Sequence, residues 1–165
     1  MDYIEVELYG RKIRYFSEEH VEAEFRNIKG YWRKKPIAHR NGYKSYHFKS
    51  NGKDNYVGLH RLTFFIHNPS WNIYDGSTNN SIDHKNNEPS INNIENLRCV
   101  TNQENAWNRP KSKGYSWHKH KKKWQAHIGV DGKTIYLGAF IKEEDARNAY
   151  LEAKKIHHII KEKVF

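Results

Sequence analysis

The first part of the chain alternates apolar and polar residues, which is the pattern of half-buried β-strands. Ile4 to Tyr9 and Lys12 to Phe16 alternate on either side of Gly10 and predict a β-hairpin. Ser17 then stands in the position of a helix N-cap with two glutamates behind it, and it predicts a short helix as far as Phe25. The pattern assigns no function to this segment.

The middle of the chain carries a second hairpin signal, followed by a helical one. Two strand-like runs, Gly42 to Phe48 and Tyr56 to Leu59, flank Asn51-Gly52, a dipeptide typical of tight turns. From His60 to Ile66 the large apolar residues recur at helical spacing. Asn68-Pro69 is expected to end that helix, because a proline disfavours helical geometry in the residue before it.

A loop and a capped helix are predicted next. Residues 72–80 are rich in asparagine, glycine and serine, which favours a loop. Further along, Thr101 and Glu104 have the spacing of a capping box, in which each side chain bonds to the backbone of the other residue. This pair predicts a helix that begins at Asn102 and carries Asn105 in its first turn.

Three strands and one amphipathic helix are predicted after the basic stretch Arg109 to Lys113. The strands cover Tyr115 to His120, Trp124 to Val130 and Thr134 to Leu137. Asp131-Gly132 supplies a tight hairpin turn between the last two strands. Small and apolar residues from Ala146 to Ile156 follow helical periodicity, so the helix is expected to pack on the sheet.

The charge of the chain narrows the class of its partner. The 165 residues carry a formal net charge of +10, which favours a polyanion. No apolar run is long enough to span a bilayer, and no lipidation or secretory signal is recognised, so we expect a cytoplasmic protein that binds nucleic acid and no membrane. The single cysteine, Cys99, excludes an internal disulfide and any zinc site built from several thiolates.

The dipeptide Asp83-His84 is the candidate chemical centre. Hydrolysis of a phosphodiester needs a metal ion on oxygen ligands, a base that deprotonates water, and stabilisation of the leaving oxygen. Asp83 and Asn105 offer oxygen ligands, and His84 offers the base. An isolated Asp-His pair is more often an ordinary loop pair without a metal, so the interpretation depends on the residues around it.

Five ordered blocks around this dipeptide resemble the HNH homing endonucleases of the ββα-metal class. The blocks are Val57-Gly-Leu-His-Arg-Leu62, Phe65-Ile-His-Asn-Pro69, Ser81-Ile-Asp-His84, Asn92-Asn-Ile-Glu-Asn-Leu-Arg98 and Val100-Thr-Asn-Gln-Glu-Asn105. The resemblance implies a nuclease that cuts double-stranded DNA with His84 as general base. It also implies that Asp83 and Asn105 hold magnesium, or manganese, whose remaining ligands are waters and a substrate phosphate, and that no zinc is bound.

Asn96 matches the middle asparagine of the family motif, which implies that it braces the loop bearing His84 through hydrogen bonds. An ordinary turn asparagine is the open alternative. Asp83 and His84 are expected in or beside the second strand of the ββα unit, and neighbours in a regular strand point to opposite faces. We therefore expect a distorted strand end, with the capped helix bringing Asn105 across to the site.

Three further residues of this region are candidate DNA contacts: His60, Arg61 and Arg98. Arg61 has a guanidinium that can form paired bonds to a phosphate. A surface arginine on a short helix is equally consistent with the sequence, and Arg98 leaves the same two alternatives open.

The C-terminal module, Gly114 to His158, resembles the three-stranded APETALA-type DNA-binding domain. The matching blocks are Gly114-Tyr-Ser-Trp117, Lys123-Trp-Gln-Ala-His-Ile128, Gly132-Lys-Thr-Ile-Tyr-Leu-Gly-Ala-Phe140 and Glu144-Asp-Ala-Arg-Asn-Ala-Tyr150. In that family the sheet lies in the major groove of DNA and the helix packs behind it. Serine, histidine and threonine stand here in place of the arginines typical of plant members, so the target sequence does not carry over.

This second resemblance implies a DNA-binding face on the sheet. Its candidate residues are Ser116, His118, Gln125, His127, Thr134 and Tyr136, with Lys119, Lys121, Lys122 and Lys123 as phosphate contacts. Trp117 and Trp124 are expected to be core aromatics rather than stacking platforms for bases.

The expected fold is α+β, with a ββα-metal HNH nuclease module followed by a three-stranded antiparallel sheet packed on one helix. We expect a β-rich segment over residues 1–55, the nuclease module over 56–109, a basic linker over 110–113 and the DNA-binding domain over 114–165.

The expected function is that of a phage or mobile-element homing endonuclease, acting as a monomer or homodimer in the cytoplasm of a bacterium or a virus-infected host cell. Two alternatives stay open: a catalytically silent, sequence-specific DNA-binding regulator, and a restriction-type HNH nuclease.

Overall fold

The computed structural model describes residues 2–24, 28–40, 42–50, 52–110 and 112–165, which fall into two compact units. The first unit is Met1–Val100 together with Glu162–Phe165, and the second is Thr101–Lys161. These units differ from the expected domains, because the helix that begins at Asn102 groups with the C-terminal sheet. Among the described residues, no helix is long and apolar enough to cross a bilayer.

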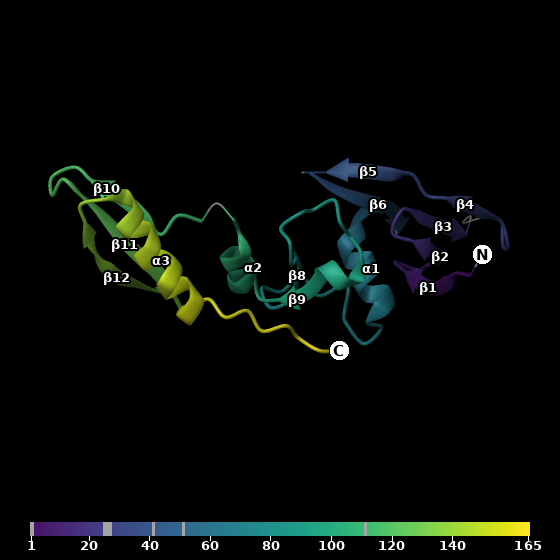
Figure 1. The fold of residues 1–165 in the computed structure, drawn as a ribbon. Coiled ribbons are helices and arrows are strands. Elements are labelled where there is room, and N and C mark those ends of the chain that lie inside the picture. Colours follow the sequence, from purple (N-terminus) through teal and green to yellow (C-terminus); the bar gives the residue numbers. More distant parts are fainter. Residues whose placement is uncertain (1, 25–27, 41, 51, 111) are drawn as a thin grey trace. The chain divides into compact units, whose positions relative to one another are not determined.

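The first unit begins with a four-stranded antiparallel sheet of β1 (Ile4–Leu8), β2 (Arg11–Ser17), β3 (His20–Glu24) and β4 (Trp32–Lys34) (Figure 1). The predicted hairpin is confirmed, and Gly10 turns it with φ of +67°.

The helix predicted from Ser17 is wrong, because the chain turns and returns at once as β3. Val21 and Ala23 bury their side chains on one face of that strand, and this packing outweighs the local capping signal. Phe25, the predicted end of the helix, lies outside the described residues.

A second antiparallel sheet contains β5 (Ile37–Arg40), β6 (Tyr43–Ser50) and β7 (Lys53–Gly58). The predicted β6–β7 hairpin is confirmed, although Asn51 of its turn lies outside the described residues. The helix α1 (Leu59–His67) follows and ends at the C-cap Asn68, as predicted. Residues 72–80 form a loop, also as predicted.

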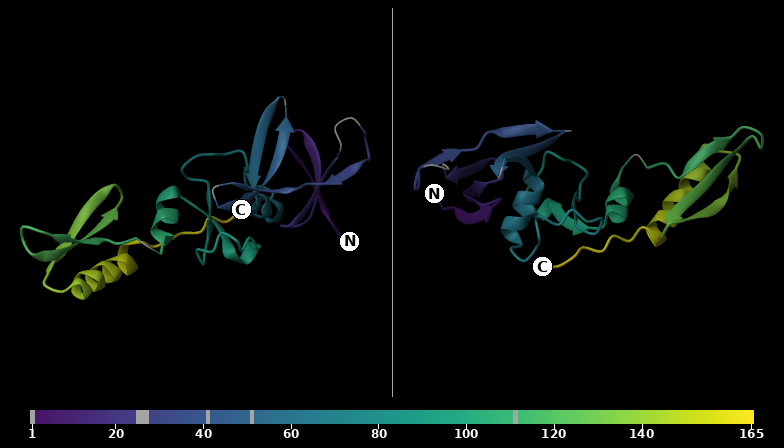
Figure 2. Two further views of the ribbon diagram at one scale, coloured as in Figure 1. Left: turned by 90° about the horizontal axis from the view of Figure 1, so that it is seen from above. Right: turned by 180° about the vertical axis from the view of Figure 1, so that it is seen from behind.

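The last elements of the first unit are β8 (Ser81–His84), the 3₁₀ turn η1 (Ile94–Asn96) and β9 (Leu97–Val100). Helix α1 contacts both the β6–β7 hairpin and the β8–β9 hairpin, and so joins the two in one core (Figure 2).

Large, fully buried side chains fill this core, among them Trp71, Phe48 and Leu62. Cys99 is also fully buried, and burial raises the pKa of its thiol.

The final residues of the chain return to this core. The Phe165 ring meets the Phe64 ring edge-on with centroids 5.9 Å apart, and the Lys163 N–H donates to the Cys99 carbonyl at 3.1 Å. Glu162 pairs with Lys85 at 3.3 Å. The first unit is therefore built from two separate stretches of the sequence.

The second unit holds α2 (Asn102–Asn108), a three-stranded antiparallel sheet and α3 (Glu143–His157). The strands are β10 (Tyr115–His118), β11 (Lys123–Val130) and β12 (Lys133–Phe140). Figure 1 shows α3 lying along one face of the sheet, as predicted. Ile128 is buried there against Tyr150 and Ala153 of α3.

The two tryptophans of the sheet differ from the expected core aromatics. Trp117 and Trp124 pair in register across β10 and β11, with ring centroids 5.5 Å apart. Trp124 is half-buried, but Trp117 is 45% exposed, so its assignment to the core is wrong. The buried cluster formed with α3 comprises other residues, among which Ile128 and Tyr150 provide most of the apolar surface.

Candidate active site

Asp83 and His84 lie at the end of β8, the first strand of the β8–β9 hairpin rather than the second strand that we expected. The pairing of β8 with β9 runs without a shift from Ser81 to His84, so the predicted distortion of the strand end is absent. Neighbours in a regular strand project to opposite faces, so the approach of Asp83 and His84 to one phosphate stays a prediction. The chain bends only after His84, in the loop over residues 85–96.

Asp83 is held by a buried ion pair with Arg98. The two residues are directly opposite in the hairpin register, and Arg98 donates from Nε at 2.9 Å and from Nη2 at 2.8 Å to Asp83 Oδ2. Asp83 is 5% exposed and the Arg98 side chain 13%. The Arg98 guanidinium therefore fixes the carboxylate in place, and its contact with a phosphate stays a prediction.

His84 is oriented by Asn92. The His84 Nε2 and Asn92 Oδ1 atoms are 3.1 Å apart, and both residues are buried. Asn92 Nδ2 donates to the Ser90 carbonyl at 3.2 Å, which leaves its oxygen toward the histidine. Because that oxygen only accepts, the histidine donates to it from Nε2. Sequence reasoning missed Asn92, although it opens one of the matching blocks.

Two aromatic neighbours surround the His84 ring. The His60 ring lies 5.4 Å from it and the Tyr43 ring 6.3 Å, both between centroids. Gly58 permits this arrangement, because a Cβ at that position would come within 2.6 Å of His60 Cε1. The structure thus places His60 beside His84, where it is half-buried. Burial, together with His84 and Arg61 nearby, lowers the pKa of His60 from 6.5 to about 3.

Acid should therefore destabilise the native chain more than a His60→Gln variant. The folded protein keeps His60 neutral, so between pH 6.5 and about 3 the unfolded chain binds the additional proton. The stabilisation is complete above pH 6.5 and falls by roughly 2–3 kcal/mol by about pH 4.5. Urea unfolding of both proteins at about pH 7 and about pH 4.5 measures this difference. Equal acid sensitivity would contradict the assignment.

Asn96 closes the loop that follows His84. Its Oδ1 accepts from the Asn86 backbone N–H at 3.1 Å, its Nδ2 donates to the Ile91 carbonyl at 2.8 Å, and its own carbonyl accepts from the Lys85 N–H at 2.8 Å. These bonds cross the loop and join its two ends, which is the geometry of a brace. The contribution of this brace to catalysis stays a prediction.

Arg61 binds the loop that follows α1. Its guanidinium donates to the backbone carbonyls of Asn80, Ile73 and Asp75 at 3.1, 2.8 and 3.1 Å, and it lies over the Trp71 ring at 4.7 Å from the centroid. Three carbonyls of the loop over residues 72–80 thus take three of its five donors. Arg61 holds this loop on α1, and its contact with a phosphate stays a prediction.

Asn105 lies in α2 of the second unit, in the first turn of a helix with the predicted capping box. The Glu104 N–H donates to Thr101 Oγ1 at 3.1 Å, and the Thr101 N–H donates to Glu104 Oε2 at 2.8 Å. Two contacts hold α2 to the C-terminal segment: Glu104 Oε1 accepts from the Lys161 N–H at 3.0 Å, and Trp107 stacks on His158 at 4.5 Å. The approach of Asn105 to Asp83 stays a prediction.

The predicted DNA-binding residues of the second unit share one face of its sheet. Register pairs Ser116 with Gln125 and His127 with Tyr136, and His127 and Tyr136 also meet with ring centroids 5.2 Å apart. Ser116, Thr134 and Tyr136 are exposed, and so are Lys119, Lys121, Lys122 and Lys123. His118, Gln125 and His127 are half-buried on the same face. Their contact with DNA stays a prediction.

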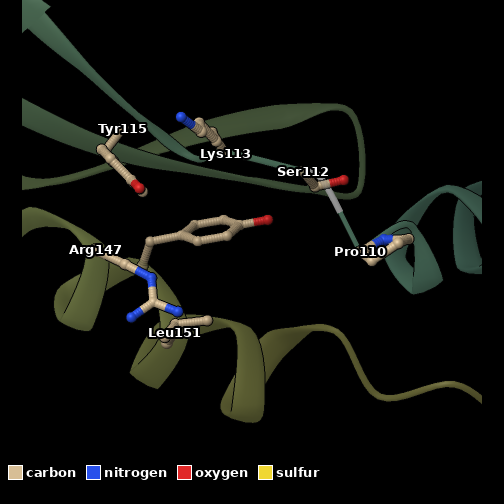
Figure 3. A pocket seen from close by; sticks show the side chains of 7 residues that line it. Pro110, Ser112, Lys113, Tyr115, Arg147 and Leu151 are labelled. Carbon is tan, nitrogen blue, oxygen red and sulfur yellow. The ribbon is translucent and has the colours of Figure 1, made fainter.

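A hollow of about 350 Å³ lies on the helix side of the second unit (Figure 3). Lys113 and Tyr115 line it from the strand side, and Arg147 and Leu151 line it from α3. Because α3 covers the face of the sheet opposite the predicted DNA-binding face, this hollow is separate from that face.

The donor types of the two predicted ligands, Asp83 and Asn105, suit a hard cation. Among the described residues, no group of three or more histidine, cysteine, aspartate or glutamate side chains gathers as a metal cage. A buried carboxylate on Asp83 and an amide oxygen on Asn105 are hard oxygen donors, and magnesium is commonly held by one or two protein oxygens while waters and phosphates complete its shell. The residues present therefore fit magnesium or manganese.

Comparison with known proteins assigns a family resemblance to one part of the chain. Residues 57–107 match a family model described as HNH endonuclease. The matched segment contains Asp83, His84, Asn92, Asn96 and Asn105, and it covers less than half of the chain. No curated protein and no solved structure matches the chain. The match shows that this segment is similar to HNH endonucleases.

Proposed function

We propose that the chain is a metal-dependent DNA endonuclease of the homing type. The observation that carries this proposal is the orientation of His84, whose Nε2 is directed to the Asn92 oxygen. A buried histidine held at one ring nitrogen by a side-chain acceptor has the fixed orientation that a general base needs. The family match over residues 57–107 supports the same reaction.

In this proposal Asp83 and Asn105 hold the magnesium or manganese ion. When bound, the ion supplies positive charge that neutralises the scissile phosphate and the leaving oxygen. Arg98 positions the Asp83 carboxylate through the bonds of 2.8 and 2.9 Å. The part of Asn105 rests on its place in the motif and on the capped first turn of α2.

His84 accepts the proton of the attacking water at Nδ1, and Asn92 is the positioning residue that keeps Nε2 protonated. His60 contributes no proton, because its pKa of about 3 leaves it neutral at the pH of the reaction. Asn96 maintains the loop between His84 and β9.

We assign the shared face of the β10–β11–β12 sheet to DNA contact, with the four lysines Lys119, Lys121, Lys122 and Lys123 at phosphates.

Incubation with supercoiled plasmid DNA tests the proposed function. With magnesium or manganese the protein should convert the plasmid to nicked circles, because one site per chain cuts one strand, and chelation with EDTA should stop the conversion. Agarose electrophoresis measures the products. If the protein binds the plasmid but leaves it supercoiled with either metal, the chain is a DNA-binding regulator and not a nuclease.

A further inference from the structure

The N-terminal sheet separates its charged side chains by face. Leu8 pairs with Arg11, Ile13 with Ala23 and Ala23 with Arg33, so Arg11 and Arg33 lie on the core-facing side of the sheet. The glutamates of these strands alternate with the core-facing residues and therefore lie on the other face. They are Glu5, Glu7, Glu22 and Glu24. The core-facing side therefore carries Arg11 and Arg33 without carboxylates from the same strands, whereas Lys34 pairs with Glu22 on the other face.

These cations gather around two hollows at the end of the core. Lys35 follows β4, and its N–H donates to the Val21 carbonyl at 2.8 Å, which keeps it against β3. One hollow, of about 310 Å³, is lined by Arg11, Ala23, Arg33, Lys34, Lys35 and Pro36. The other, of about 550 Å³, shares the residues from Arg33 to Pro36 and adds Glu19 and Ile37. We call this surface, defined by Arg11, Arg33, Lys34 and Lys35, the basic groove.

No ion pair between described residues involves a cation of the basic groove. Among the described residues, none of its four cations has a carboxylate oxygen within 4.0 Å. Glu19, the one carboxylate that lines the larger hollow, is paired with Lys44. Burial lowers the pKa of Lys35, and Arg11 and Arg33 lower it further by repulsion. Like charges held together in a hollow favour an anionic ligand.

We propose that the basic groove binds the phosphodiester backbone of DNA and that this is the role of the N-terminal sheet. Two adjoining hollows that share Arg33, Lys34 and Lys35 suit a linear polyanion with regularly spaced charges better than a single small anion. The contact is to phosphate and therefore independent of base sequence, so it adds affinity but no target preference. The proposal goes beyond the proposed cleavage reaction and rests on binding alone.

Binding of a fluorescein-labelled DNA duplex in EDTA tests this proposal without cleavage. The groove variant Arg33→Gln/Lys35→Gln is compared with the control Lys12→Gln/Lys53→Gln, which removes the same charge from exposed lysines outside the groove. If two phosphate contacts are lost, the slope of log affinity against log salt between about 50 and 200 mM should decrease by about 1.8. Affinity should fall by about tenfold or more, against about twofold for the control.

Two further measurements distinguish a lost DNA contact from misfolding of the groove variant. Lys35 lies 5.3 Å from the Phe48 ring centroid, so the single variant Arg33→Gln, which keeps that contact, should show about half of the change in slope. In the native protein, bound duplex should slow acetylation of Lys34 and Lys35 but not of Lys12, as read by mass spectrometry.

The outcomes separate this proposal from the proposed function. Unchanged affinity and slope in the groove variant, or equal acetylation of Lys35 with and without duplex, would overturn the basic groove even if the protein cuts plasmid DNA. A reduced slope in a protein that never cuts DNA would uphold the groove and overturn the nuclease.

Discussion

Replacement of His84 by alanine is expected to lower the rate of plasmid cleavage by about 10² to 10⁴-fold, the usual contribution of a general base. The loss should appear in kcat, because the histidine acts on the attacking water. DNA affinity measured in EDTA should be nearly unchanged. The control is His39→Ala, which removes an exposed histidine of β5 and should leave cleavage at the native rate.

Misfolding is the competing explanation for such a loss, because His84 is 6% exposed and bonded to Asn92. A His84→Gly variant separates the two, since added imidazole can enter the space beside Tyr43 and His60 and restore part of the activity only if a base is missing. Asn92→Ala should reduce kcat less than His84→Ala and change the pH profile of cleavage. The variant loses the hydrogen bond that orients the His84 ring but keeps the imidazole itself. Native rates in His84→Ala would rule out the assigned base.

Replacement of Asp83 by alanine should abolish metal-dependent cleavage and also destabilise the fold. It leaves the Arg98 guanidinium, 13% exposed, without its carboxylate. Removal of one partner of a buried ion pair typically costs about 3–5 kcal/mol. Urea unfolding measures the free energy, and the plasmid assay measures the activity.

A second substitution separates the two effects of Asp83. In Asp83→Leu/Arg98→Met both charges are removed, so the free energy of unfolding should return to near the native value while cleavage stays absent. Asp83→Asn provides a milder control, because its amide oxygen still accepts from Arg98 but has lost the negative charge that holds the metal. Cleavage by the double variant would show that Asp83 serves only the hairpin.

Short-range signals in the sequence predicted much of the fold. The turn at Gly10, the capping box of Thr101 and Glu104 and the Asp131-Gly132 turn each involve neighbours in the chain, and each is present. The helix predicted from Ser17 failed because Val21 and Ala23 are buried by packing against distant residues, which a local pattern does not contain.

The contacts that build the site depend on pairing across the fold. Arg98 meets Asp83 because the β8–β9 register sets them opposite one another, and Arg61 is occupied because a loop of the chain folds over α1. The sequence identified His84, but its partner Asn92 is separated from it by a loop whose path Asn96 determines. Residue types were therefore predictable, whereas their partners required the tertiary structure.

The return of Glu162–Phe165 to the first unit has a consequence for protein engineering. The second unit is an insertion in the first, with a junction at each end, and not a terminal appendage. Exchange of its three-stranded sheet for another by fusion at a single point would discard Phe165 and Lys163, which contact Phe64 and Cys99 in the core. A chimera that retains a stable first unit needs two crossover points, one near residue 101 and one near residue 161.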